Sequence, residues 1–233
     1  MSQLRAALRD TYEIHYQRRN QPTGHEDAAQ TRADLDATYG SLLKNLPAGS
    51  EVLDLGCGGG HLLKWMFNYD NVIPIGADSS PGQVEAARNS IKRGEVHLAD
   101  GLDFLTRNQG RFAGIYCFDV LEHIPGEDLL YEWVLKIKGA LKPGGFFCCK
   151  VPNRANMLCG YSRYLDLTHV RLFTVSSLLQ LLNDAAKFED CRVMPLRSTC
   201  LRGRLRLAGE RLTHKVLYRI TGRHLSDDVY TRM

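Results

Sequence analysis

The sequence lacks any long apolar run. No stretch of its 233 residues approaches the roughly 20 consecutive apolar residues that a membrane-spanning helix needs. The first 16 residues are charged and lack the apolar segment of a secretory signal peptide. Internal repeats and low-complexity segments are absent as well, so the sequence predicts neither a membrane protein nor a repeat architecture.

Cysteine is present but lacks the spacing of a structural role. The seven cysteines are an odd number, and no two of them stand in C-x-x-C order. Several lie inside apolar runs, where a free thiol behaves as a small hydrophobic side chain. This pattern argues against a disulfide framework and structural zinc, and it favours a protein of the reducing cytoplasm.

The composition is that of one globular domain with appendages. Hydrophobic residues make up 44% of the chain and charged residues 24%, and 233 residues are too few for two full domains. We predict an N-terminal helical cap over residues 1–48, a central domain over 49–196 and a basic helical tail over 197–233.

Strand-like and helical segments alternate along the central part. Apolar strands are predicted over 52–55, 71–78, 96–100, 112–118 and 146–151. Helices are predicted over 61–66, 81–92 and 127–141, and a tight turn over 142–145 leads into the fifth strand. Later segments read as a long loop over 153–170, a helix over 174–186 capped by Thr174 or Ser176, and a strand over 188–193. This alternation predicts a parallel, doubly wound α/β sheet with ligands beyond the carboxyl ends of its strands.

A glycine-rich turn directly follows the first strand. Gly56 permits a sharp strand-to-helix turn, and Gly58 and Gly60 remove side chains where backbone must approach a ligand. A dinucleotide-binding domain would share these glycines. Asp54 argues against that alternative, because its carboxylate would repel a pyrophosphate but suits the cationic amino-acid end of S-adenosylmethionine.

Two further acids end the next strands. Asp78, at the end of the second strand, is placed to accept hydrogen bonds from both ribose hydroxyls of a nucleoside. Asp100, followed by Gly101 and Leu102, ends the third strand. There it could accept the adenine amino group beside an apolar wall.

Over about residues 50–152, these motifs together with D-V-L-E-H at 119–123 and L-K-P-G-G at 141–145 occur in the order of a known family. The chain resembles the class I S-adenosylmethionine-dependent methyltransferases. The resemblance implies a Rossmann-like, mostly parallel, seven-stranded sheet and S-adenosylmethionine as cofactor. It implies that the cofactor contacts Asp54, Gly56, Cys57, Gly58, Asp78, Ser79, Asp100, Gly101, Leu102 and Asp119.

The acceptor side offers two candidate bases. The resemblance places Glu122 and His123 at the edge of the acceptor pocket, where a histidine can take a proton near neutral pH. Asp166 and His169, in the polar and aromatic loop 160–173, could form an oriented acid–imidazole pair. Both sets have a structural alternative, in which they cap the next helix or brace the loop.

The same loop and the residues after it carry a D-x-T-H-x-x-x-F-T-x-x-S-L run. This run resembles a subgroup of bacterial methyltransferases from surface-polysaccharide and glycan pathways. The carboxylate spacing of catechol-type, metal-dependent enzymes is absent, so no metal site is expected. An Asn-Pro-Pro-Tyr type of motif for methylating base amines is absent too.

The tail is the basic part of a chain with a net charge of only +4. Apolar residues recur from Leu201 to Ile220 at helical spacing, with arginines around them. Such a stripe could pack on the domain or on a second subunit as a homodimer, lie on an anionic membrane surface, or grip phosphates. Its shortage of aromatic residues argues against single-stranded nucleic acid as a partner.

We therefore predict an S-adenosylmethionine-dependent O-methyltransferase that acts on a sugar or glycan intermediate. The catalytic candidates are His123, and His169 with Asp166. Two alternatives stay open: an O- or N-methyltransferase for a small-molecule natural product, and a non-catalytic scaffold subunit that binds the cofactor.

Overall fold

A computed structural model describes residues 28–154, 164, 166–201, 203–205, 207–209 and 230–232. Its centre is a sheet of five parallel strands in the order β3-β2-β1-β4-β5. Beyond β5, the short strand β7 pairs antiparallel with β5, and the short strand β6 pairs antiparallel with β7. The strands are β1 Ser50–Leu55, β2 Val72–Asp78, β3 Glu95–Leu98, β4 Phe112–Phe118, β5 Leu141–Lys150, β6 Arg192–Val193 and β7 Tyr230–Arg232.

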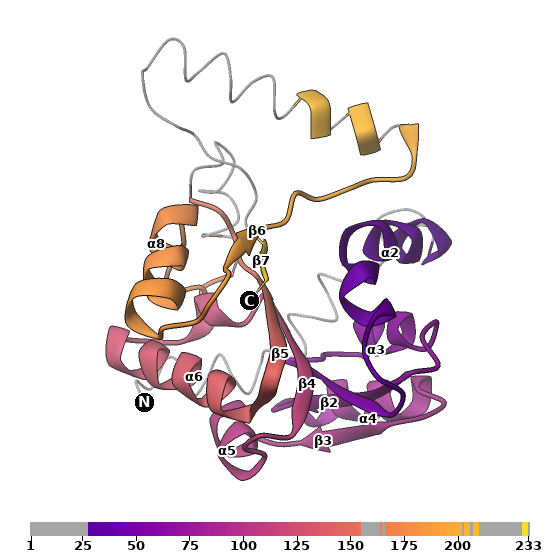
Figure 1. Cartoon of the computed structure of the whole chain (residues 1–233), viewed down its shortest axis with the longest axis horizontal. Coiled ribbons are helices and arrows are strands. Elements are labelled where there is room, and N and C mark those ends of the chain that lie inside the picture. The colour runs from indigo at the N-terminus through magenta and orange to yellow at the C-terminus, as the bar shows by residue number, and fades with distance from the viewer. Residues whose placement is uncertain are drawn as a thin grey trace.

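Helices cover both faces of the sheet (Figure 1). One face carries α2 (Ala28–Lys44), α3 (His61–Met66) and α4 (Pro81–Ser90). The other carries α5 (Gly101–Arg107), α6 (Glu127–Ala140), and α8 (Val175–Leu179) with its π-helical continuation (Gln180–Ala185). This arrangement is an α/β, Rossmann-like fold with a parallel sheet, as the alternating pattern predicted.

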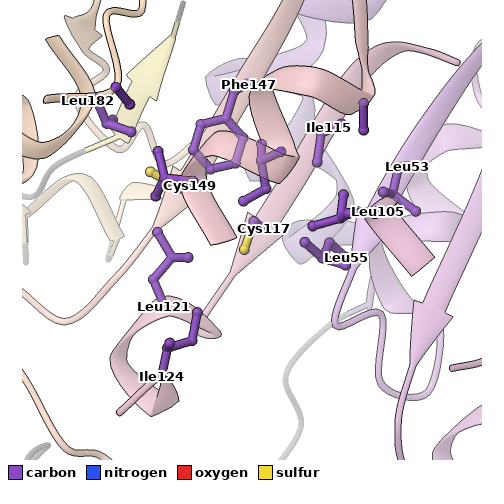
Figure 2. Packing of buried hydrophobic residues seen from close by; sticks show 14 of the residues in the cluster. Leu53, Leu55, Leu105, Ile115, Cys117, Leu121, Ile124, Phe147, Cys149 and Leu182 are labelled. Atoms are coloured by element: carbon purple, nitrogen blue, oxygen red, sulfur yellow. The ribbon is translucent and has the colours of Figure 1, made fainter. Parts of the chain in front are cut away.

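Two hydrophobic clusters hold the layers together because successive strand residues point to opposite faces. Leu53, Ile115 and Phe147 belong to the cluster under α5, α6 and α8, and Figure 2 shows this packing. Val52 and Tyr116, their neighbours in sequence, belong to the cluster under α2, α3 and α4. Each cluster fills the space between one face of the sheet and the helices that cover it. Ligands of such folds bind outside this packing, beyond the carboxyl ends of the strands.

Most of the predicted central elements are confirmed, and two differ. The segment 142–145, predicted as a turn, lies within β5, where the register jumps from Phe112 opposite Leu141 to Gly114 opposite Phe146. The late strand is confined to 192–193. Helix α5 was not predicted, because Asp100 and Gly101 were interpreted only as ligand-binding residues.

The helix predicted over 174–186 forms in two parts and has the predicted cap. The side chain of Thr174 accepts a hydrogen bond from the Ser177 amide, and the Ser177 side chain returns to the Thr174 amide. This capping box satisfies amides that a helix start leaves without intrahelical partners. Buried Leu178 and Leu182 then fix the helix against the sheet.

The beginning of the predicted tail contacts the helix that belongs to the predicted cap. Asp34 of α2 accepts hydrogen bonds from the Ser198 hydroxyl and from the Thr199 amide, at 3.0 and 2.7 Å. The Arg197 amide donates to the hydroxyl of Thr38. The domain boundaries themselves stay a prediction, since residues 1–27 and most of the tail beyond 201 lie outside the described residues. Within the described part, no helix is long and apolar enough to cross a membrane.

Candidate functional site

The turn after β1 has the backbone shape that its glycines predicted. The backbone φ angles of Gly56, Gly58 and Gly60 are positive, at 79°, 49° and 81°. Residues other than glycine rarely adopt this conformation. A Cβ atom on Gly56 would stand 2.4 Å from Cγ2 of Val120. The turn therefore requires glycine for both backbone conformation and space. Cys57 lies buried within it.

Asp54 is a buried carboxyl group in the strand before this turn. Only 3% of the residue is exposed. Burial, and then the negative charge of Asp78, raise the pKa of Asp54 to about 8. A cationic group brought beside it would favour its ionised form, which is the environment that an amino-acid ammonium would supply.

Asp78 joins the end of β2 to the glycine-rich turn. Its Oδ2 accepts a hydrogen bond from the Gly58 amide and its Oδ1 accepts one from the Ser80 amide, both at 2.9 Å. These two bonds fix the carboxylate, while each oxygen keeps a lone pair for a further donor. Ser79, beside it, is exposed.

Asp100 is the N-cap of α5. Its Oδ1 accepts hydrogen bonds from the amides of Leu102 and Asp103, at 2.9 and 3.3 Å. Gly101 has no room for a side chain, because a Cβ atom there would stand 2.3 Å from the ring of Trp133. Capping α5 thus holds the Asp100 carboxylate beyond the end of β3, and its contact with adenine stays a prediction.

Asp119 follows β4 in a strained conformation. Its φ is 56°, and its amide donates to the Lys150 carbonyl at 2.8 Å. Its Oδ2 forms an ion pair with Nζ of Lys150 at 2.6 Å. Sequence reasoning missed Lys150, since the pairing depends on β4 and β5 being neighbours.

The acceptor-side candidates meet beyond β4. Asp166 Oδ1 accepts hydrogen bonds from the amide and hydroxyl of Thr168, at 2.8 and 2.6 Å. The Thr168 hydroxyl oxygen lies 2.8 Å from Nδ1 of His123. The rings of His123 and His169 lie 4.7 Å apart, centroid to centroid. A hydrogen-bonded chain thus joins Asp166 to His123 through Thr168, and a direct pairing of Asp166 with His169 stays a prediction.

Burial and hydrogen bonding set the pKa values of Asp166 and His123 in this hydrogen-bonded chain. Burial raises the pKa of Asp166, but the hydrogen bonds from Thr168 outweigh it and the pKa lies below its usual value. For His123, burial and then the neighbouring His169 lower the pKa to about 4. The His123 imidazole is therefore neutral at physiological pH and carries one lone pair.

Glu122 lies beside His123 and His169. It is fully buried, and neither carboxylate oxygen has a hydrogen-bond partner among the described residues. Burial, and then the charge of Asp119, raise its pKa to about 8. Its carbonyl accepts the amides of Val170 and Arg171, at 2.9 and 3.3 Å, which ties the loop carrying His169 to Glu122. These long-range contacts have no local sequence signal.

The parallel sheet, the glycine-rich turn and the acids at successive strand ends define a Rossmann-like cofactor-binding domain. A family described as a methyltransferase domain matches residues 28–189, more than half of the chain. The chain therefore belongs to this methyltransferase family. Solved S-adenosylmethionine-dependent methyltransferases share its fold.

Individual relatives agree with this assignment. A ubiquinone biosynthesis O-methyltransferase of Coxiella burnetii is 28% identical over 109 residues, which cover 46% of this chain and 45% of that protein. The chain thus matches less than half the length of that relative. Two solved structures share the fold. One is a SAM-dependent methyltransferase of Archaeoglobus fulgidus, with a TM-score of 0.65, 19% identity, and 88% of this chain and 92% of that chain covered. The other is the plantazolicin methyltransferase BpumL in complex with SAH, with a TM-score of 0.59, 19% identity, and 94% and 86% covered.

Proposed function

We propose that this methyltransferase transfers the methyl group to a hydroxyl oxygen, and that the acceptor is a sugar or glycan intermediate. The observation that carries the proposal is the Asp166–Thr168–His123 chain beyond β4, which orients a neutral imidazole. O-methylation of a poorly acidic hydroxyl needs a group that removes its proton. The naming of curated relatives as O-methyltransferases supports oxygen as the acceptor atom.

The donor side of the site fits S-adenosylmethionine. The buried carboxyl of Asp54 suits the cationic amino-acid end, and Asp78 and Asp100 suit the ribose and the adenine amino group. Cys57, Ser79, Leu102 and Asp119 complete the proposed contacts. The bound cofactor supplies an electrophilic methyl group on a sulfonium. The chain's own residues align the acceptor with it and take up one proton.

The tautomer of His123 follows from its partners. The ionised Asp166 can only accept, so the Thr168 hydroxyl donates to Asp166, and its oxygen accepts from Nδ1–H of His123. Nε2 therefore carries the lone pair and is the atom that would accept the hydroxyl proton. His169, buried beside the ring, holds it in place.

A small-molecule natural product is the second candidate acceptor. The curated relatives named for ubiquinone biosynthesis favour it. An apolar acceptor site walled by tyrosines would suit such a molecule, but Tyr164 is 79% exposed. Tyr161 lies outside the described residues. The exposed Tyr164 and the polar loop favour a hydroxyl-rich acceptor.

Two observations support proposals for the cellular location of the protein and for the contacts of its tail. Cys57 and Cys117 are buried and form no disulfide within the described part of the chain, which fits a reducing cytoplasm. The docking of residues 197–199 on α2 favours packing on the domain for the start of the tail. We also propose that the basic part of the tail contacts an anionic membrane surface or a second subunit.

The test is methyl transfer by the purified full chain. Labelled S-adenosylmethionine is offered with nucleotide sugars, lipid-linked glycans and phenols, and the product is analysed for an O-methyl linkage. Label in a sugar hydroxyl is expected, whereas label only in phenols or amines would overturn the glycan proposal. Turnover by the chain alone would also exclude a scaffold role.

A pair of variants tests the proposed proton acceptor. Asp166→Asn should lower kcat while leaving the affinity for S-adenosylmethionine unchanged, because it weakens the chain that orients His123. Asp184→Asn, an exposed acid on the π-helical segment, is the matched control and should leave kcat unchanged. Equal kcat in wild type and Asp166→Asn would contradict the role of the chain.

A further inference from the structure

Glu122, His123 and His169 form a group that the fold and the donor site do not explain. One potential ligand atom from each side chain lies within 4.8 Å of the other two. Glu122 is completely buried, His169 is 6% exposed and His123 is partly exposed. Neither oxygen of the buried Glu122 carboxyl group has a hydrogen-bond partner among the described residues, which is costly, so this arrangement calls for a partner.

We propose that these three side chains bind a divalent first-row transition-metal cation. Two imidazoles and one carboxylate are the ligand set of open zinc sites and of other first-row metal sites, in which the remaining positions take water or substrate. Metal–ligand bonds of about 2.1 Å place neighbouring ligand atoms roughly 3 to 3.5 Å apart. Small side-chain rotations would bring the group to that spacing.

The hydrogen bonds around His123 prepare it as a ligand. With Nδ1–H donated to Thr168, the lone pair lies on Nε2. Metal-bound histidines commonly donate their other ring N–H to an oxygen acceptor that fixes their tautomer. Here Thr168 and Asp166 supply that second layer.

Backbone hydrogen bonds hold the loop that carries the third ligand, His169, in place. Val170 and Arg171 donate their amides to the Glu122 carbonyl, and the His169 amide donates to the Asp166 carbonyl at 3.2 Å. These bonds join a loop and a 3₁₀ turn that are far apart in sequence, so the group is preorganised.

The surrounding charges also favour a cation. Asp119 and Asp166 both lie close enough to act electrostatically on Glu122. Lys150, the cation nearby, is ion-paired with Asp119. Nitrogen ligands favour zinc or cobalt over magnesium, which prefers oxygen.

The inference departs from the sequence analysis, which expected no metal. Its role in catalysis rests on the proposed function: a cation there would lower the pKa of an acceptor hydroxyl. With the cation bound, His123 would be a ligand, and the acidified acceptor hydroxyl would give its proton to solvent water.

The test is cation binding by the untagged full chain after treatment with a chelator and dialysis. Zn²⁺ is titrated by calorimetry, and Co²⁺ is titrated by visible absorption, which reports its coordination. One equivalent of each should bind, and Mg²⁺ should bind far more weakly. Glu122→Gln and His169→Asn should weaken Zn²⁺ binding by roughly 100-fold or more. Thr168→Val should weaken it by about 10–100-fold, the usual effect of changing an outer-layer partner.

His97→Asn is the matched control. His97 lies 2.9 Å from Glu95 on β3, in a partly exposed His–Glu pair outside this group. The variant should bind Zn²⁺ as wild type does. Affinity for S-adenosylhomocysteine, measured in every variant, reports whether the fold is intact. If His97→Asn loses Zn²⁺ binding and Glu122→Gln keeps it, the metal belongs to the surface pair and the proposal is overturned. The absence of Zn²⁺ binding in wild type would overturn it as well.

The two proposals fail in different ways. Unchanged O-methyl transfer after chelation, without Zn²⁺ or Co²⁺ binding, would overturn the metal site and leave the O-methyltransferase proposal standing. Stoichiometric binding that Glu122→Gln removes, without O-methylated product with or without cation, would support the metal site and overturn the proposed function.

Discussion

Replacing Asp54 with asparagine should change how stability depends on pH. The pKa of Asp54 is about 8 in the folded apoprotein, against 3.8 for an ordinary aspartate. Between these values the folded state holds a proton that the unfolded chain has lost. Stability therefore falls as pH rises through this window, by about 1.4 kcal/mol per pH unit from this group alone.

The magnitude follows from the width of the window. At pH 7 the cost of burying this carboxyl is about 4 kcal/mol relative to low pH, from the 3.8 and about 8 values. Asparagine at this position cannot ionise and avoids that cost. The difference in unfolding free energy between Asp54→Asn and wild type should grow by about 1.4 kcal/mol per unit from pH 5 to 8.

Denaturant unfolding of both apoproteins at several pH values measures this difference, in which other titrating groups largely cancel. The cofactor gives a second readout. Its cationic amino-acid end should favour the Asp54 carboxylate, so binding at pH 6–7 should release a proton in wild type but not in Asp54→Asn. Calorimetry in buffers of different ionisation enthalpy detects this proton. If the stabilities of wild type and Asp54→Asn change in parallel with pH, and both proteins release the same number of protons on binding the cofactor, the raised pKa of Asp54 is refuted.

Three further predictions concern the same framework. Asp78→Ala should weaken cofactor binding strongly in calorimetry, because it removes the acceptor fixed by Gly58 and Ser80, whereas the exposed Asp70→Ala should not. Gly101→Ala should lower stability by about 1–3 kcal/mol in denaturant unfolding, through overpacking against Trp133; Gly209→Ala, with open space around it, should not lower stability. Thr174→Ala should cost about 1 kcal/mol by removing the capping box, and an unchanged melting curve would contradict the cap.

Local sequence was sufficient for the elements that combine an apolar run with a distinct end. β1 ends in a glycine turn and β2 in an acid, so both strands were predicted. The segment 142–145 reads as a turn because of Pro143, Gly144 and Gly145. The structure keeps it inside β5 as an irregularity, since pairing with β4 continues on both sides of it. Such pairing is a property of two strands, which one strand's sequence does not contain.

The cluster of side chains beyond β4 was predictable only residue by residue. His123, Asp166 and His169 were recognised as candidates, but their arrangement depends on how the loop returns to β4. The amide bonds from Val170 and Arg171 to the Glu122 carbonyl set that return, and backbone bonds are independent of side-chain identity. The group of Glu122 with both histidines therefore left no spacing pattern to detect.

Acidic groups gather at two places along the carboxyl edge of the sheet, and at each place one buried carboxyl group has a raised pKa. Asp54 is affected by burial and Asp78, and Glu122 by burial and Asp119. Burying carboxyls in this way costs stability, which a cationic occupant offsets. The cofactor's cationic end would serve the first place and the proposed metal the second. Each ligand at 100 times its Kd should add about 2.7 kcal/mol of stability. The two increments should add if the places are independent, and any departure from additivity measures their coupling.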